Sequence, residues 1–271
     1  MSPFIVPVAL LVGVVLGALG GGGSILTVPA LVYLLGQEPA AATTGSLIIV
    51  GTTTLIGAVP HLRAGRVRLG QGVVFGTLGV GGAYLGSRLS VTVDPDLLLA
   101  AFAVLMLVVA GLMTRRRRAG RRGGADDAAP GRERAVVGLR PVRCDCRALL
   151  VLVAAATGVG LLTGFFGVGG GFAVVPALVL ALRLPMPVAI GTSLVVIAIN
   201  SASALGSRLG QRVELDWAVI GTFTAIAVVG SLLGARLVSR VRPARLELAF
   251  TVLLVAVALY TAARSVPALA A

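Results

Sequence analysis

The chain has 271 residues, of which 57% are hydrophobic and 12% are charged. A soluble domain carries about 25% charged residues, so this chain has too little polar surface to be a soluble globular protein. All 23 basic residues are arginine, and 11 of them lie in residues 114–147. This concentration is typical of the cytoplasmic bias of membrane proteins and argues against a nucleic-acid-binding surface.

The first apolar stretch, about Phe4–Leu19, is predicted to be a retained membrane span, because it lacks the basic start of a removed signal peptide. A run of glycines interrupts it, and a short apolar segment follows at Ser24–Leu35. Longer stretches at 43–59, 69–88 and 97–113 are predicted spans, since a span needs about 20 mostly apolar residues. Helices are favoured over barrel strands, which alternate apolar and polar residues.

Residues 114–147 interrupt the apolar pattern with Arg, Gly and Asp. They are predicted to form a cytoplasmic linker, flexible at least up to Arg134, between a first repeat at 1–113 and a second at 148–271. Cys144 and Cys146 are expected to be reduced thiols without a partner. No metal site is expected, because structural zinc usually takes four ligands and the one histidine, His61, lies far away in the sequence.

The second half contains the same elements, with a first span at 149–165, a short segment at 172–182 and long spans at 188–205, 215–237 and 246–263. GGGGSILTVPALVYLL at 20–35 matches GVGGGFAVVPALVLAL at 167–182. Aligning Pro29 with Pro176 sets an offset of 147 residues, which also places Ser46 on Ser193. The sequence therefore predicts an internal duplication in an all-α polytopic membrane protein with about 8–10 spanning or partly spanning helices.

The short segments leave two topologies open. If they cross, each half has five passes and the halves are inverted; if they dip and return, each half has four passes and the halves are parallel. With the linker inside, the inverted scheme places Arg240, Arg242 and Arg245 inside and Arg208 and Arg212 outside, and the parallel scheme does the reverse. The more basic loop should be cytoplasmic, so inverted repeats with both termini outside are preferred.

The two glycine clusters are the leading candidates for a substrate-binding site. Each glycine costs a helix about 1 kcal/mol relative to alanine. Two matched clusters therefore indicate that helices break at mid-membrane and present free amides and the positive start of the next helix to an anion. Close helix packing is the alternative explanation. The candidate glycines are Gly20, Gly21, Gly22 and Gly23 in the first half and Gly169, Gly170 and Gly171 in the second, with Gly167 nearby.

Small polar side chains are predicted to complete the site. Ser24 occupies the position of an N-cap, where its hydroxyl caps the short helix or contacts the substrate. The starts of the following spans and one amide either line the pocket or serve capping and helix contacts. These residues are Gly45, Ser46, Thr192, Ser193 and Asn200.

Two prolines, Pro29 and Pro176, lie inside the short segments and are expected to kink them, either as simple bends or as gates. His61 ends a span beside Arg63 and is expected at the membrane interface. No carboxylate lies in the middle of a predicted span, which argues against a relay of buried acids or a hard-cation site. No catalytic constellation or cofactor motif is recognisable, so the chain is predicted not to be an enzyme and to need no cofactor.

These motifs together resemble the TauE/SafE sulfite-exporter family of membrane permeases. The resemblance rests on GGGGSILTVPAL, GVGGGFAVVPAL, TTGSL and GTSLVV and on the duplicated layout, and it covers nearly the whole chain outside the linker. It implies a secondary transporter in the plasma membrane that moves a small anion, such as sulfite or an organosulfonate, with that anion and lipid as partners. The alternative is a non-transporting scaffold or membrane-embedded assembly factor whose basic linker binds lipid or a partner.

Overall fold

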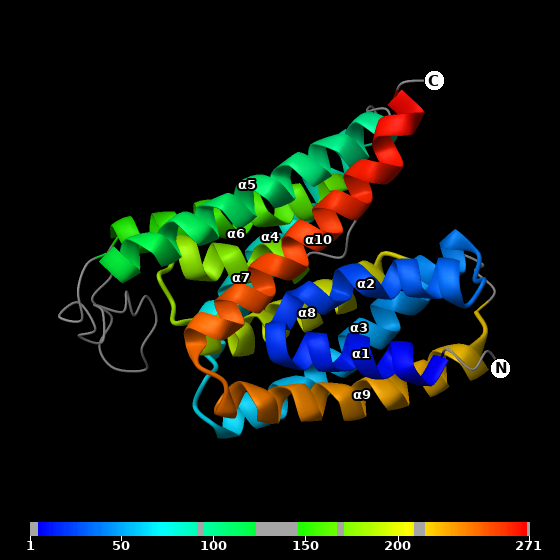
Figure 1. Ribbon diagram of the computed structural model, residues 1–271, viewed down its shortest axis with the longest axis horizontal. Helices are drawn as coiled ribbons and strands as arrows, with labels where there is room; N and C mark the ends of the chain where they lie inside the picture. The colour runs from blue at the N-terminus through cyan, green and yellow to red at the C-terminus, as the bar shows by residue number, and fades with distance from the viewer. Residues whose placement is uncertain (1–4, 91–94, 123–145, 167–170, 209–214, 270–271) are drawn as a thin grey trace.

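The computed structural model describes residues 5–90, 95–122, 146–166, 171–208 and 215–269, and all regular structure in these ranges is helical (Figure 1). The prediction of an all-α polytopic fold is therefore confirmed. The elements are α1 Ile5–Leu19, η1 Gly20–Gly23, α2 Ser24–Pro29, η2 Ala30–Leu34, α3 Pro39–Arg63, α4 Leu69–Ser90, α5 Pro95–Arg122, α6 Cys146–Phe166, α7 Gly171–Leu180, α8 Met186–Gly206, α9 Trp217–Arg240 and α10 Pro243–Leu269.

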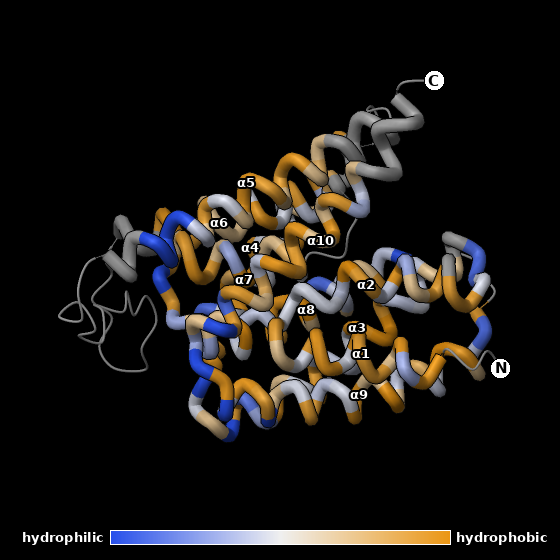
Figure 2. Tube along the Cα trace, viewed as in Figure 1, coloured by the Kyte–Doolittle hydropathy of each residue, from blue (hydrophilic) through white to orange (hydrophobic). Residues whose placement is uncertain are grey.

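Five helical stretches among the described residues are long and apolar enough to cross a bilayer. They are Ile5–Val32, Ala41–Arg63, Met186–Gly206, Trp217–Arg240 and Pro243–Ala262. Hydrophilic residues gather toward the ends of the bundle, with hydrophobic residues between them (Figure 2). This distribution is what a lipid environment requires, because the bilayer core offers no water to polar groups.

The first of these stretches reverses direction at its glycines. Gly20 has a φ of +66°, a left-handed conformation that glycine adopts without steric cost. A Cβ at Gly23 would lie 2.6 Å from the backbone nitrogen of Leu16, so the chain has turned back on itself within seven residues. As a result α2 and η2 run back beside α1, and the stretch forms a hairpin instead of one straight span (Figure 1).

The longest helix contacts join the two halves of the chain. α1 packs along α9, and α6 packs along α4. In the first seam a methyl group at Gly13 or Gly17 would overlap the backbone of Ala227 or Ser231, and in the second a methyl group at Gly160 or Gly164 would overlap that of Gly79 or Ala83. Small residues allow such close backbone approach in membrane helices.

The two seams use equivalent positions. Gly13 and Gly17 become Gly160 and Gly164 at the offset of 147 residues that the proline alignment sets, and their partners on α9 and α4 differ by 148 residues. The same correspondence relates α3 to α8 and α5 to α10, and both of those pairs are in contact. We infer that the halves are duplicated units, each of which packs its first helix against the third long helix of the other.

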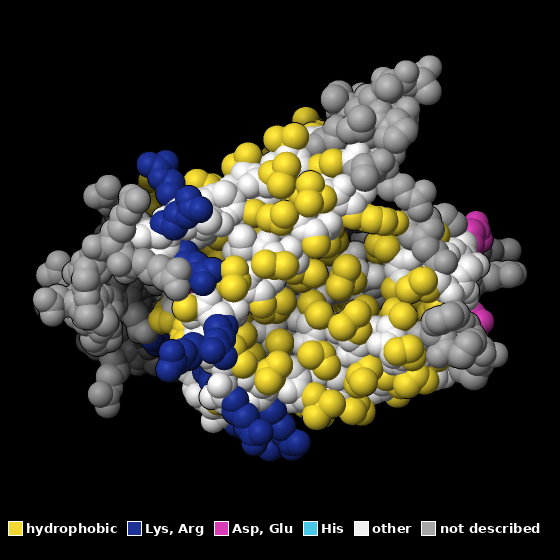
Figure 3. All heavy atoms as spheres, viewed as in Figure 1, with side chains coloured by type: hydrophobic (Ala, Val, Ile, Leu, Met, Phe, Trp, Pro, Cys, Tyr) yellow, Lys and Arg dark blue, Asp and Glu magenta, His cyan; other side chains and the backbone are white. Residues whose placement is uncertain are grey.

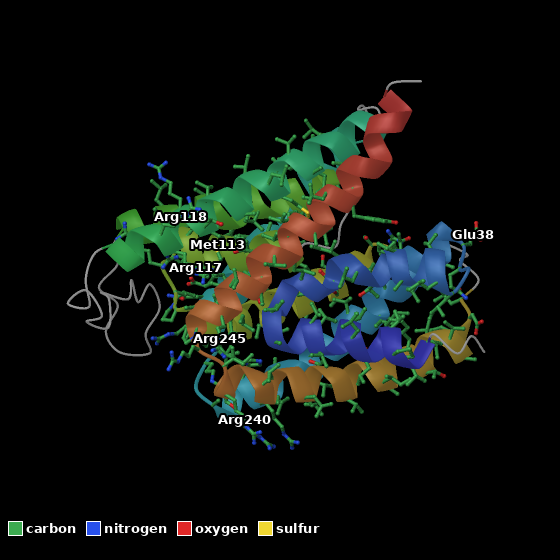
Figure 4. All side chains as sticks on the ribbon, in the orientation of Figure 1. Glu38, Met113, Arg117, Arg118, Arg240 and Arg245 are labelled. Carbon is green, nitrogen blue, oxygen red and sulfur yellow. The ribbon has the colours of Figure 1, made fainter. Side chains whose placement is uncertain are left out.

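Charge divides the bundle into two ends. Arg117, Arg118, Arg240 and Arg245 lie at one end, and Glu38 lies at the other (Figure 4). The space-filling view shows basic side chains gathered at the first end and hydrophobic side chains covering the body between (Figure 3). The start of α1 and the end of α10 lie toward the Glu38 end (Figure 1). The inverted scheme predicts termini at the end opposite the linker, and the positive-inside bias predicts that the arginine end faces the cytoplasm.

The linker begins later than the sequence suggested. α5 continues to Arg122, so the expectation of a flexible chain from residue 114 is wrong for its first nine residues. Arginine is a good helix former, and basic residues are favoured in the last turns of a helix by the macrodipole. In addition, the Arg116 guanidinium donates a hydrogen bond to the Val179 carbonyl near the end of α7. Residues 123–145, including Cys144, lie outside the described residues.

Cysteine labelling tests this orientation. Ser239 is exposed near the end of α9, and Ser207 is exposed just after α8, at the opposite end of the bundle. In a background without Cys144 and Cys146, a cysteine at 207 should react with an impermeant maleimide added to whole cells, whereas one at 239 should react only after lysis. The reverse pattern would contradict the inverted arrangement.

Candidate functional site

The two glycine clusters meet inside the bundle. A methyl group at Gly21 would overlap the carbonyl oxygen of Gly171, and a Cβ at Gly171 would lie 2.5 Å from the carbonyl oxygen of Gly21. These backbones therefore touch without any side chain between them. Gly21 belongs to the reversal in the first half, and Gly171 begins α7 in the second half. The start of α7 therefore lies against η1, the glycine turn that precedes α2.

Two buried serines flank this contact. The Ser24 hydroxyl fills the space next to Gly171, and the Ser193 hydroxyl fills the space next to Gly20. Each hydroxyl donates to a carbonyl three residues earlier, Ser24 Oγ to Gly21 O and Ser193 Oγ to Ile190 O, both at 2.7 Å. Ser193 is fully buried and Ser24 is 7% exposed. The result is a small polar centre contributed by both halves.

The local geometry of Ser24 differs from the expectation. Ser24 is the first residue of α2, the N-cap residue is Gly23, and no side chain caps this helix. The Ser24 N–H donates to Gly21 O, so η1 continues directly into α2 and leaves fewer free amides than an open break would. The prediction of a serine N-cap is therefore wrong: a short 3₁₀ turn satisfies backbone groups that a capping side chain would otherwise serve.

The other candidate glycines face different neighbours. Gly22 lies toward α10, where a Cβ would be 2.8 Å from Leu253 Cδ2, and Gly23 lies against α1. Gly45 on α3 packs against Ile220 of α9. Of the candidate glycines, Gly20, Gly21 and Gly171 therefore lie at the centre. Gly22, Gly23 and Gly45 lie in helix contacts away from it. Gly169 and Gly170 lie outside the described residues.

The polar candidates on α3 and α8 also separate. Thr192 is fully buried and accepts a hydrogen bond from the backbone N–H of Arg68 at 3.1 Å. Ser46 donates to Thr43 O at 2.8 Å within its own helix. Asn200 lies two turns beyond Ser193 on α8, and its Oδ1 is 3.8 Å from a Cβ at Gly79 of α4. Asn200 therefore belongs to the α4–α8 contact and is not among the residues that touch the glycine centre.

Both prolines lie where the short helices were expected to bend. Pro29 is the last residue of α2, and η2, a π-type turn, follows directly. Proline removes a backbone donor and disturbs the preceding turn, which explains a change of helix type at this position. Pro176 is buried inside α7. A gating role for either proline stays a prediction.

His61 occupies a position that sequence reasoning missed. It is 1% exposed, so its side chain faces the interior of the bundle and not lipid or water, while its depth in the membrane stays a prediction. Its Nε2 lies 3.1 Å from the carbonyl oxygen of Gly17, in the last turn of α1. Its Cβ is 3.1 Å from a Cβ at Gly191, two residues before Ser193. Carbonyls at a helix end lack intrahelical partners, and the reversal after α1 creates such a carbonyl for His61 to bind.

Arg208 holds the equivalent position in the second half. The offset of 147 residues that aligns Ser46 with Ser193 also aligns His61 with Arg208. The Arg208 guanidinium donates to Thr43 Oγ1 at 3.1 Å and to Thr44 Oγ1 at 2.9 Å, at the start of α3. His61 and Arg208 thus each join the end of one long helix to the start of its counterpart, at opposite ends of the bundle.

The centre between these contacts is tightly packed. Two cavities lie away from this centre, one of about 910 Å³ beside Arg115 and Arg118 and one of about 560 Å³ beside Trp217. No group of three or more metal-ligating side chains is present in the described ranges.

Comparison with known proteins identifies the family of this chain. The model of the sulfite exporter TauE/SafE family matches residues 5–261. The chain belongs to the TauE/SafE family. The resemblance noted from the glycine and hydroxyl motifs is thereby confirmed over nearly the whole chain.

Two relatives with transporter names are similar to this chain over most of its length. A probable membrane transporter protein of Xylella fastidiosa (strain 9a5c) is 35% identical over 259 residues, which cover 94% of this chain and 92% of the relative. The probable membrane transporter protein YdhB of Bacillus subtilis (strain 168) is 27% identical over 235 residues, covering 86% and 88%. No solved structure matches the chain. This TauE/SafE protein is therefore a multi-pass membrane transporter.

Proposed function

We propose that this protein is a secondary transporter that moves a small anion, sulfur-containing such as sulfite or an organosulfonate, across the plasma membrane. The observation that carries the proposal is the meeting of the two glycine segments. Gly21 and Gly171 touch at a buried point where Ser24 and Ser193 supply hydroxyls. Both halves therefore contribute to one site, as expected for transporters built from repeats.

The charge distribution supports an anionic substrate. Helices α1, α2, α3, α6, α7, α8 and α9 contain no Asp or Glu, so no carboxylate of these helices repels an anion at the centre. The start of α7 lies at the contact, and a helix start carries roughly half a positive charge. Arginines at the two ends of the bundle add long-range attraction. A hard cation would lack the carboxylates that it needs.

The contacts at the two ends support alternating access. At the Glu38 end, Arg208 joins α8 to Thr43 and Thr44 of α3. At the arginine end, His61 packs on Gly191 of α8, and Arg68 donates to Thr192. Both ends of the α3–α8 pair are closed in this conformation, so opening requires one set of contacts to break. Movement of one half against the other around a fixed centre is the expected mechanism.

Transport in proteoliposomes tests the proposal. Purified protein would be reconstituted with an internal unlabelled anion, and the exchange of external labelled sulfite, sulfate, sulfoacetate and isethionate would be followed. Exchange of at least one of these anions, above protein-free liposomes, is expected. Absence of exchange for the whole panel, with choline and amino acids as comparison solutes, would reject the assignment of a sulfur-containing anion.

The serines should contribute modestly to affinity. Ser24→Ala and Ser193→Ala each remove a hydroxyl that has to turn from its helix carbonyl to donate to an anion. Because one hydrogen bond is exchanged for another, each variant should lose about 1 kcal/mol, or about fivefold in Kd. Exchange rates across a range of substrate concentrations measure this change. Ser207→Ala, at an exposed helix end, is the matched control and should leave affinity unchanged.

A further inference from the structure

We propose that His61 carries the proton that couples anion movement to the proton gradient. This inference rests on the proposed anion transport. The two equivalent positions differ in their side-chain charge. The second half has a permanently charged guanidinium at Arg208, and the first half has a titratable imidazole at His61. The protein thus has a fixed cation at one end of the α3–α8 pair and a switchable one at the other.

Hydrogen bonding identifies the nitrogen that titrates. The Gly17 carbonyl can only accept, so the imidazole Nε2 must carry a hydrogen and donate to it. Nδ1 is then the nitrogen that gains or loses a proton. Nδ1 is buried and has no hydrogen-bond partner among the described residues. In the proposed cycle this lone pair binds a proton when the arginine end opens to water.

No side chain of the surrounding helices neutralises the resulting charge. His61 contacts Gly17 of α1 and Gly191 of α8, and its own helix α3 also packs along α9. None of these four helices contains an Asp or Glu. The charged groups near it are cationic: Arg63 follows on the same helix, and Arg66 donates its backbone N–H to the His61 carbonyl. Arg236 and Arg240 lie toward the end of α9. A buried imidazolium therefore receives no counter-charge from these helices, which is costly.

A bound anion supplies that counter-charge. His61 contacts Gly191, and two residues later Ser193 lies against Gly20 at the glycine centre. The Gly17 carbonyl that His61 binds lies in the last turn of α1, three residues before Gly20. Proton and anion binding therefore favour each other, and by linkage each should tighten the other by about 5–150-fold. The protonated, anion-loaded form and the empty, neutral form would be the two states that reorient, which is proton–anion symport.

Proteoliposomes again provide the test, with two readings on the same preparation. The first is anion exchange at equal pH on both sides, and the second is accumulation driven by an acid exterior with the membrane potential clamped. Wild-type protein is expected to show both. His61→Gln keeps a donor for the Gly17 carbonyl but binds no proton, so exchange should persist while acid-driven accumulation falls about tenfold or more. Ser239→Ala, an exposed and uncharged change at the same end of the bundle, should retain both.

The outcomes separate the two proposals. If no anion of the panel exchanges in wild-type protein, the anion-transport proposal fails and this inference fails with it. If exchange occurs but His61→Gln accumulates the anion as wild-type does, His61 is not the coupling residue and anion transport stands. His61→Arg should exchange anions with little dependence on pH, because its charge is permanent.

A measurement on the unmodified protein covers the case in which the variants do not fold. Binding of sulfate, which does not itself titrate near neutral pH, would be measured in weakly buffered detergent solution containing a pH indicator. Uptake of up to about one proton per bound anion is expected within the range of about pH 5 to 8. Binding without proton uptake across that range would overturn the inference.

Discussion

Replacing Gly21 or Gly171 with alanine is expected to abolish anion transport in protein that still reaches the membrane. The new methyl group would overlap a backbone carbonyl of the other half, and backbone cannot rotate away as a side chain can. The two short helices would be pushed apart at the point where the substrate is proposed to bind. Since small misplacements at a binding centre can cost about 100-fold in rate, transport should fall by at least that factor in reconstituted vesicles.

Gly22→Ala is the matched control for this prediction. Its methyl group would meet Leu253 Cδ2, the far end of a flexible side chain, at 2.8 Å. This neighbour can change rotamer, so most of the activity should remain. Only protein that elutes as a single species in detergent should be compared. Parental transport by Gly21→Ala and Gly171→Ala would show that the contact of the two breaks is not the substrate site.

Valine at Gly17 or Gly164 is expected to prevent stable folding. These residues form the α1–α9 and α4–α6 seams, where even a methyl group would overlap the backbone of the facing helix. A branched side chain forces the helices apart over the full seam, at a cost of more than about 3 kcal/mol. Thermal stability in detergent and the yield of monodisperse protein measure the effect.

Gly158→Val and Gly221→Val are the controls, because they place the same side chain on α6 and α9. A Cβ at either position meets nothing within 4 Å. Both variants should therefore be as stable as the parent. Equal destabilisation by the seam and control substitutions would mean that helix propensity, and not close packing, dominates the effect.

Charge and proline positions were enough to locate most of the helices from the sequence. α4 begins at Leu69 as expected, and α1, α8 and α9 begin or end within about three residues of the predicted bounds. Apolar runs bounded by arginine or proline have few alternatives in a bilayer. The end of α5 was misplaced because a run of arginines predicts both a loop and a good helix, and only contacts such as that between Arg116 and Val179 decide between them.

The candidate site was predictable only in part. Two repeated glycine motifs pointed to Gly20, Gly21 and Gly171, because a repeated departure from helix propensity needs a common cause. The direction in which each glycine faces depends on the turn at Gly20, which no pattern of residue types fixes. The contact of His61 with Gly17 joins residues 44 positions apart. The only signal in the sequence that singled out His61 was its alignment with Arg208 at the offset of 147 residues.

The packing of α1 on α9 and of α4 on α6, each across the two halves, has a consequence for biosynthesis. α1 leaves the ribosome early, yet its seam partner α9 is made near the end of translation, and α4 must wait for α6. Until then the glycine faces of both helices contact lipid. No hydrophobic driving force favours their association with another helix, because lipid tails are as apolar as the side chains. A chain that stops in the linker lacks both seams. The transporter can therefore complete its tertiary structure only after its second half has been inserted.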